Sequence, residues 1–187
     1  MKILALGLGL WALGTAGADT PAVLENEHVR VTRDAAPCAD AGAGCAESII
    51  IVLGEPNRGA ITVHPRGARY PAPSGTYFAV NIKPQRPPVK SPAVLIPPDK
   101  NSILYDGDDF FIFEEKLDPG DTRARHSHRE RVVIVLNETR LQQWPDGAPE
   151  VFRDQVPDDV HFNQPVVHVV KTVGERPLRN IVIEFKH

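Results

Sequence analysis

The sequence predicts an all-β protein, built as a sandwich or a barrel. Proline makes up 18 of the 187 residues, nearly twice the average of roughly 5%, and proline interrupts helices but is tolerated at strand ends and turns. Short runs of β-branched and aromatic residues recur between turn sequences such as Asp118-Pro119-Gly120-Asp121, a pattern typical of sandwiches and barrels. No stretch repeats apolar residues at helical spacing over three turns.

Seven apolar runs are the predicted strands. In chain order they cover 28–31, 48–53, 76–82, 110–113, 131–136, 166–170 and 180–185. Apolar residues are 42% of the chain and charged residues 24%, which is typical of a globular protein. The net charge of −3 leaves no basic excess to neutralise phosphates, so we expect no nucleic-acid partner.

The first eighteen residues have the layout of a secretory signal peptide. Lys2 supplies a positive charge, 3–13 is an apolar run, and Ala16-Gly17-Ala18 offers small residues for cleavage before Asp19. The run is shorter than the roughly 20 residues of a membrane-spanning helix, although an uncleaved anchor is the alternative. We therefore expect an exported protein, periplasmic or extracellular, with no membrane association after cleavage.

The two cysteines fit an oxidising compartment. Cys38 and Cys45 lie in a loop of small residues, and two such thiols in an exported protein are expected to pair as a disulfide. A loop this short would contribute about 2–3 kcal/mol. The alternative is a two-cysteine metal site, which would lack partners because no histidine lies between His28 and His64.

Two parts of the chain resemble each other. The segment 47–55 matches 130–138 at five of nine positions, 23–31 resembles 103–113, and 73–84 resembles 175–186, in the same order. The chain therefore divides into a first unit, 19–84, a proline-rich connector, 85–100, and a second unit, 101–187. The alternative is that valine-rich strands simply look alike.

The candidate chemistry lies in the second unit, in the segment 120–128. Side chains alternate along a strand, so His126 and His128 point the same way and their imidazoles can meet one cation. The third imidazole comes from His161 or His168. By the same alternation Thr122 and Ala124 share the histidine face, and the opposite face carries the remaining side chains, Arg123, Arg125 and Ser127.

At these residues the chain resembles the cupin superfamily. Gly120, His126 and His128 match the spacing of its first motif. Pro165 and His168 match its second, in which Thr172 stands where the family has asparagine. The resemblance implies a double-stranded β-helix, or jelly roll, for the second unit and a degenerate cupin-like first unit. It also implies a mononuclear metal held by His126, His128 and His168.

The resemblance has one clear departure. The family glutamate would fall at position 132 or 133, and both are valine. Glu130 comes two residues too early; it either reaches inward, if the strand continues, or faces solvent. His161, Glu130 and Thr172 are therefore expected around the ligands rather than among them.

The resemblance implies a divalent metal ion, iron, manganese, nickel or zinc, and a small-molecule ligand. Three neutral ligands leave open coordination positions, which suits a metal-dependent small-molecule enzyme with dioxygenase-like or isomerase-like chemistry. The alternative is a non-catalytic cupin that binds a small ligand, or has a structural role, without metal. An enzyme requires a cavity of roughly 300–1,000 Å³, whereas a structural barrel would be filled. Many cupins form homodimers, which is a further expectation.

Overall fold

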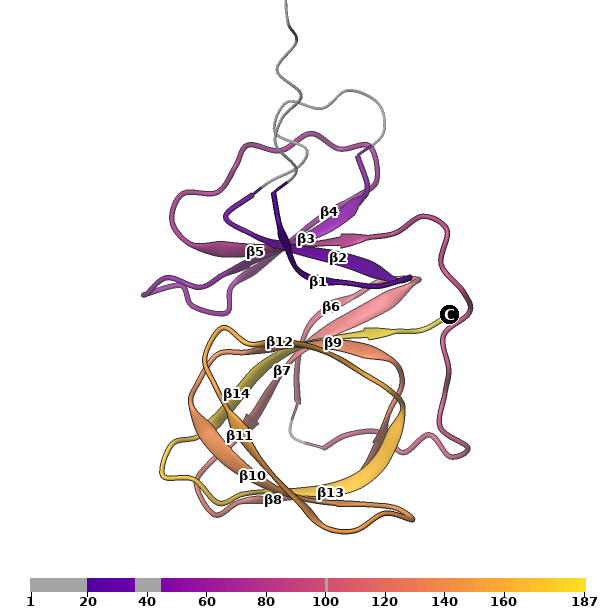
Figure 1. The fold of residues 1–187 in the computed structure, drawn as a ribbon, viewed down its shortest axis with the longest axis vertical. Helices are drawn as coiled ribbons and strands as arrows, with labels where there is room; N and C mark the ends of the chain where they lie inside the picture. The colour runs from indigo at the N-terminus through magenta and orange to yellow at the C-terminus, as the bar shows by residue number, and fades with distance from the viewer. Residues whose placement is uncertain (1–19, 36–44, 100) are drawn as a thin grey trace, which may run out of the picture.

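A computed structural model describes residues 20–35, 45–99 and 101–187, and in these residues every regular element is a β-strand. The strands form three antiparallel sheets, which we call A, B and C (Figure 1). Among the described residues there is no helix with the length and apolar character needed to cross a membrane.

Sheet A contains all the strands of the first unit. Its order is β1-β2-β5-β3-β4, with the bounds β1 Ala22–Glu25, β2 Val29–Arg33, β3 Glu47–Val52, β4 Ile61–His64 and β5 Tyr77–Ile82. It lies above the barrel in Figure 1.

Sheets B and C form the second unit, whose strands enclose the rounded barrel of Figure 1. Sheet B has the order β12-β9-β14-β7-β6: β6 Asn101–Asp106, β7 Phe110–Leu117, β9 Arg131–Val135, β12 Val160–Asn163 and β14 Leu178–Phe185. Sheet C has the order β11-β10-β13-β8: β8 Thr122–His128, β10 Thr139–Pro145, β11 Val151–Gln155 and β13 Val166–Thr172. The predicted all-β jelly roll is confirmed, and each of the seven predicted strands overlaps an observed one.

Sheet B is the middle layer of the molecule. Along β14, Ile181, Ile183 and Phe185 point toward sheet A and belong to the largest apolar core. Because successive side chains alternate, Val182 and Glu184 point the other way, into the barrel. The core between the sheets takes apolar residues from both, including Val29, Val31, Ile49, Ile51, Phe78 and Val80 of sheet A and Phe110, Ile112, Val132 and Ile134 of sheet B.

The predicted internal repeat is confirmed by the topology. The strand order of sheet A, β1-β2-β5-β3-β4, corresponds place by place to the strand order of sheet B read from β6, which is β6-β7-β14-β9-β12. Three backbone hydrogen bonds of the first unit each have an equivalent in the second unit. The bond from the Asn26 N–H to the Val29 carbonyl is matched by Gly107 to Phe110, Lys83 to His28 is matched by Lys186 to Asp109, and Leu53 to Thr76 is matched by Leu136 to Arg179.

One detail of the predicted alignment is wrong. Lys83 is equivalent to Lys186. The third block of the repeat is therefore shifted by one residue relative to the sequence alignment of 73–84 with 175–186. The sequence comparison missed this shift because a valine-rich strand matches nearly as well one residue out of register, although such a slip exchanges the two faces.

Among the described residues of the first unit there are no counterparts of the four strands of sheet C, and these residues form one open sheet rather than a second barrel. Its outer face packs on the linking segment between β4 and β5 instead. There Tyr70 is buried with Cys45, Ile50, Tyr77 and Ala79. Cys38 lies outside the described residues, so the disulfide remains a prediction, as does the signal peptide, 1–18.

The connector runs extended along the barrel without joining a sheet. The backbone N–H of Ile96 donates to Ser127 Oγ at 2.5 Å, and the N–H of Ser127 donates to the Ile96 carbonyl at 3.0 Å. The Lys90 N–H donates to Glu130 Oε2 at 2.9 Å. These contacts lie beside β8, which is the edge strand of sheet C, so the connector covers an edge that would otherwise expose unpaired backbone groups.

Candidate metal centre

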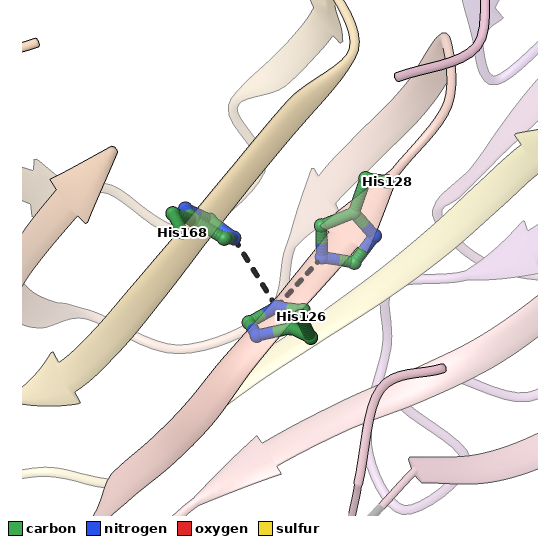
Figure 2. A group of neighbouring side chains, drawn as sticks. All are labelled: His126, His128 and His168. Carbon is green, nitrogen blue, oxygen red and sulfur yellow. Dashed lines mark hydrogen bonds between the residues drawn. The ribbon is translucent and has the colours of Figure 1, made fainter. Parts of the chain in front are cut away.

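Three histidine imidazoles meet inside the barrel, two from β8 and one from β13 (Figure 2). The Nε2 atoms of His126 and His128 are 3.0 Å apart, and those of His126 and His168 are 3.2 Å apart. All three side chains are buried, with exposed fractions of 1%, 2% and 5%. His126 and His168 lie directly opposite each other across the β8–β13 pairing, which explains why the third imidazole comes from position 168.

The tautomers of two imidazoles follow from their neighbours. His126 Nδ1 is 2.8 Å from the Ala124 carbonyl oxygen, and His128 Nδ1 is 2.9 Å from Glu184 Oε2. Both oxygens can only accept, so Nδ1 carries the proton in each ring and Nε2 is left with a lone pair. This is the arrangement in which a carboxylate or carbonyl orients a metal-binding histidine.

A cation fits these residues. The lone pairs on His126 Nε2 and His128 Nε2, which lie 3.0 Å apart, repel each other, whereas two nitrogens that share one zinc at about 2.0–2.1 Å each can stand up to about 4.2 Å apart. Burial lowers the pKa of His126, and burial together with the charge of Arg131 lowers that of His128. Burial and the two neighbouring histidines lower the pKa of His168 to about 2. All three rings are therefore neutral at physiological pH, as metal ligands must be.

A β-bulge in β8 overturns part of the predicted alternation. The pairing with β13 skips from His126–His168 to Arg123–Val170, so Ala124 and Arg125 together oppose one residue. Arg123 consequently points into the barrel, fully buried, whereas Thr122 and Ala124 are exposed. The prediction that Thr122 and Ala124 line the histidine face was wrong, because strict alternation assumes a strand without a bulge.

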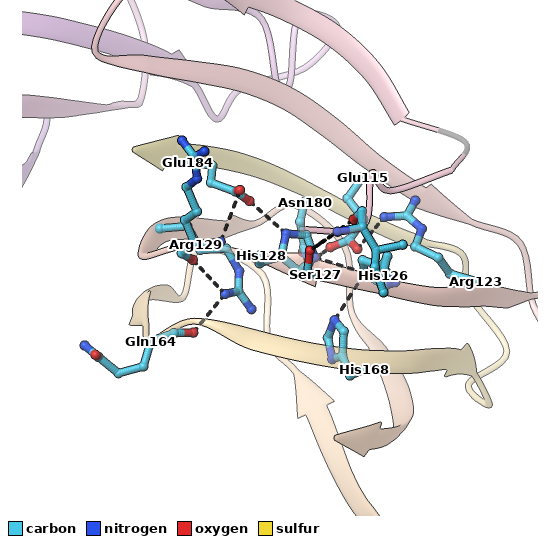
Figure 3. Close-up of polar contacts among 12 residues, drawn as sticks. Glu115, Arg123, His126, Ser127, His128, Arg129, Gln164, His168, Asn180 and Glu184 are labelled. Atoms are coloured by element: carbon cyan, nitrogen blue, oxygen red, sulfur yellow. Dashed lines mark hydrogen bonds and ion pairs between the residues drawn. The ribbon is translucent and has the colours of Figure 1, made fainter. Parts of the chain in front are cut away.

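Buried charges line the barrel beside the histidines (Figure 3). Arg123 Nη1 donates to Glu115 Oε1 at 2.7 Å, and Asn180 Nδ2 is 3.4 Å from Glu115 Oε2. Glu184 accepts a hydrogen bond from His128 Nδ1–H at 2.9 Å and another from the backbone N–H of Arg129 at 3.1 Å. Sequence reasoning missed Glu115, Asn180 and Glu184, since only the pairing of β7 and β14 with their neighbours brings them to the site.

Arg131 is the second arginine inside the barrel. It is 7% exposed and lies opposite Glu184 in the β9–β14 pairing. Its Nη1 donates to the carbonyls of Arg129 at 3.2 Å and Gln164 at 3.0 Å. Burial lowers the pKa of Arg131 to about 10, which still leaves it charged, and burial raises the pKa of Glu184.

The barrel encloses a cavity of about 550 Å³. His128 and His168 lie in its wall, together with Glu115, Arg131, Val133, Leu141, Gln143, Arg153, His161, Phe162, Gln164 and Asn180. Its volume falls within the roughly 300–1,000 Å³ of small-molecule sites. The interior is therefore not filled by side chains, as it would be in a purely structural barrel.

No family model matches the sequence, and no curated protein matches it. Solved structures do. AerE from Microcystis aeruginosa superposes with a TM-score of 0.51 at 17% identity, over 87% of this chain and 94% of that one. A cupin domain from Bordetella pertussis Tohama I covers 51% of this chain and all of its own, at 16% identity and a TM-score of 0.44. A cupin-like protein from Thermotoga maritima MSB8 covers 45% of this chain and 65% of its own, at 21% identity and a TM-score of 0.37.

The second unit has the cupin fold. At these identities the likeness establishes architecture alone. The match to AerE covers most of both chains, so sheet A is included in it. The expected glutamate of cupins has no counterpart on β9, whose Val132 lies in the core against sheet A and Val133 in the cavity wall.

The other residues expected near the cupin ligands lie in three different places. Glu130 is buried but faces the connector and sheet A, where its Oε2 is 3.5 Å from His28 Nε2. His161 lies in the cavity wall, half-exposed, 3.9 Å from Asp159. Thr172 is buried at the far end of β13, where its carbonyl accepts the Gly120 N–H at 2.8 Å.

Proposed function

We propose that this protein binds one divalent metal ion through His126, His128 and His168 and acts as an enzyme on a small molecule held in the barrel cavity. The observation that supports it is the convergence of three buried Nε2 atoms, two of them aimed by acceptors on Nδ1. Three protein ligands leave coordination positions open, which suits a catalytic metal better than a structural one.

When bound, such an ion would polarise a substrate oxygen and lower the pKa of an adjacent C–H or O–H group. The chain supplies a carboxylate in the same cavity, Glu115, whose Oε1 is held by Arg123. Glu115 Oε2 can then accept a proton from a substrate, since a carboxylate positioned in this way is a general base. The pairing of a Lewis acid with a positioned base favours isomerase-like proton transfer over dioxygenase-like chemistry.

The alternative is a cupin that binds a small ligand without catalysis. The same cavity supports it, because a cavity by itself does not require a reaction. The two functions differ in what they require of Glu115. An enzyme needs the Glu115 carboxylate as a base, whereas a binding protein needs Glu115 only as the charge partner of Arg123.

Elemental analysis of the purified mature protein tests the metal site. We expect near-stoichiometric iron, manganese, nickel or zinc in the wild type and near-complete loss in the His126→Ala/His128→Ala double variant. His161→Ala is the matched control, because His161 lies in the same cavity wall but outside the cluster. Wild-type protein that folds without metal and takes up none would contradict the proposal.

We further propose that the protein is exported and begins at Asp19 in its mature form. The sequence of residues 1–18 supports this. Mass spectrometry of the protein from its native host should give the mass of 19–187, in the periplasmic or culture fraction. A chain that retains Met1 in the cytoplasm would contradict it.

A further inference from the structure

The guanidinium of Arg131 has one edge engaged and one edge available. Both hydrogen bonds that it makes with described residues leave from Nη1, toward the carbonyls of Arg129 and Gln164. The edge formed by Nε and Nη2 makes none with the described residues, although the side chain is more than nine-tenths buried and lines the cavity. Two parallel N–H groups on such an edge match the two oxygens of a carboxylate.

The buried charges of the barrel balance before any metal is added. Arg123 pairs with buried Glu115 at 2.7 Å, and its second carboxylate neighbour, Asp99 at 3.6 Å, is 44% exposed and therefore hydrated. Arg131 lies opposite Glu184, which already accepts hydrogen bonds from His128 and Arg129. Three neutral histidines contribute no charge, so a divalent ion would leave the interior with an uncompensated double positive charge. An uncompensated charge in a buried site is costly, and an anionic ligand would offset it.

From this free edge and this charge balance we propose that the cavity ligand is a small organic carboxylate whose carboxylate group binds Arg131 beside the three histidines. The inference rests on the proposed metal site, since the excess charge comes from the ion. It adds the class of the substrate and gives Arg131 the role of anchoring it. The backbone carbonyls of Arg129 and Gln164 hold the guanidinium in place, so little side-chain entropy is lost on binding.

The test uses the mature protein loaded with Co²⁺, whose visible absorption reports changes around the ion. Acetate, lactate, pyruvate and succinate are each titrated in parallel with the corresponding neutral amide. We expect at least one carboxylate to shift the spectrum saturably and its amide to leave it unchanged. In Arg131→Gln we expect the affinity for that carboxylate to fall by at least about tenfold at unchanged cobalt content, with partial recovery in Arg131→Lys.

Arg125→Gln is the matched control, because Arg125 is exposed on β8 and paired with Asp146. It should bind cobalt and the carboxylate as the wild type does. Should Arg131→Gln not fold, the comparison of acid and amide in the wild type, with Arg131→Lys, still decides. Cobalt-loaded protein that binds none of the acids, or binds acid and amide alike, would overturn the inference and leave the metal site standing. Failure to bind cobalt would overturn both.

Discussion

Sheets A and B have the same topology, yet their corresponding faces carry different chemistry. The face of sheet B that lines the barrel has Arg131 opposite Glu184. At the equivalent positions sheet A has Ser48 opposite Asn81, joined by a hydrogen bond of 2.8 Å between Ser48 Oγ and Asn81 Oδ1. Asn180, which faces the cavity, corresponds to Tyr77, which is buried in an apolar cluster.

The difference follows from what covers each face. Sheet B is covered by sheet C, whose strands stand off far enough to leave a cavity, and a cavity can hold charged groups that are hydrated or bound to a ligand. Sheet A is covered by its own linking segment, with Tyr70 packed directly on the strands. The two sheets resemble each other most on the faces that pack together, because both must be apolar there.

The largest expected effect comes from separating the two sheets. A chain reduced to residues 85–187 would expose the apolar face of sheet B, including Phe110, Ile183 and Phe185, which sheet A now buries. An exposed patch of this kind promotes aggregation, so we expect no soluble folded protein, measured by yield and circular dichroism. A soluble, monomeric barrel that binds metal would show that sheet A is dispensable.

The charged pair that only the barrel contains should be the next most sensitive feature. Arg123→Met leaves Glu115 buried without its partner, so we expect the free energy of unfolding to fall by about 3–5 kcal/mol in urea denaturation. Arg125→Met, on the same strand but exposed, should leave the free energy of unfolding without a measurable change. Equal effects would mean that the bulge in β8 does not direct Arg123 inward.

The turns before β4 and β12 give a comparison at one backbone position. Gly59 has φ +91° and its equivalent Asp158 has φ +69°. A Cβ at Gly59 would lie 2.7 Å from Leu136 Cδ1, so Gly59→Ala should lower the free energy of unfolding by about 2 kcal/mol, since the conformation alone costs about 1–2 kcal/mol. Gly54→Ala is the control, because its Cβ would meet open space. A silent Gly59→Ala would argue against close contact between the two units here.

The smallest expected effect is the loss of stability of the metal-free protein as the pH falls. In metal-free protein the folded pKa of His168, about 2, lies below its unfolded value, near 6.5. The unfolded chain therefore binds the proton first, and stability falls as the pH drops below about 6.5 toward the folded pKa. His168 alone should remove roughly 1–2 kcal/mol by about pH 5.5, and His168→Gln should show a flatter dependence of urea stability on pH.

His161→Gln is the control for that measurement. Its side chain lies in the same cavity wall but is half-exposed, so the slope should match that of the wild type. A His168→Gln variant with the wild-type slope would show that His168 is not held neutral by burial.

The strand pattern and the repeat were predictable because they are local properties. Runs such as 48–53 and 131–136 became β3 and β9. The missed strands are short or polar: β11, for example, has exposed Phe152, Arg153 and Asp154, so no apolar run marks it. The three histidines could also be singled out, since the spacing of His126 and His128 on one strand already places two imidazoles together.

The sequence by itself determined which segments form strands and which side chains can carry metal chemistry, because alternation and residue type are written along the chain. Only the tertiary structure decided that sheet A backs the barrel, that a bulge turns Arg123 inward, and that Glu115, Arg131 and Glu184 surround the histidines. These features depend on contacts between distant strands. A one-residue change in register, invisible in composition, exchanges the faces of every residue that follows.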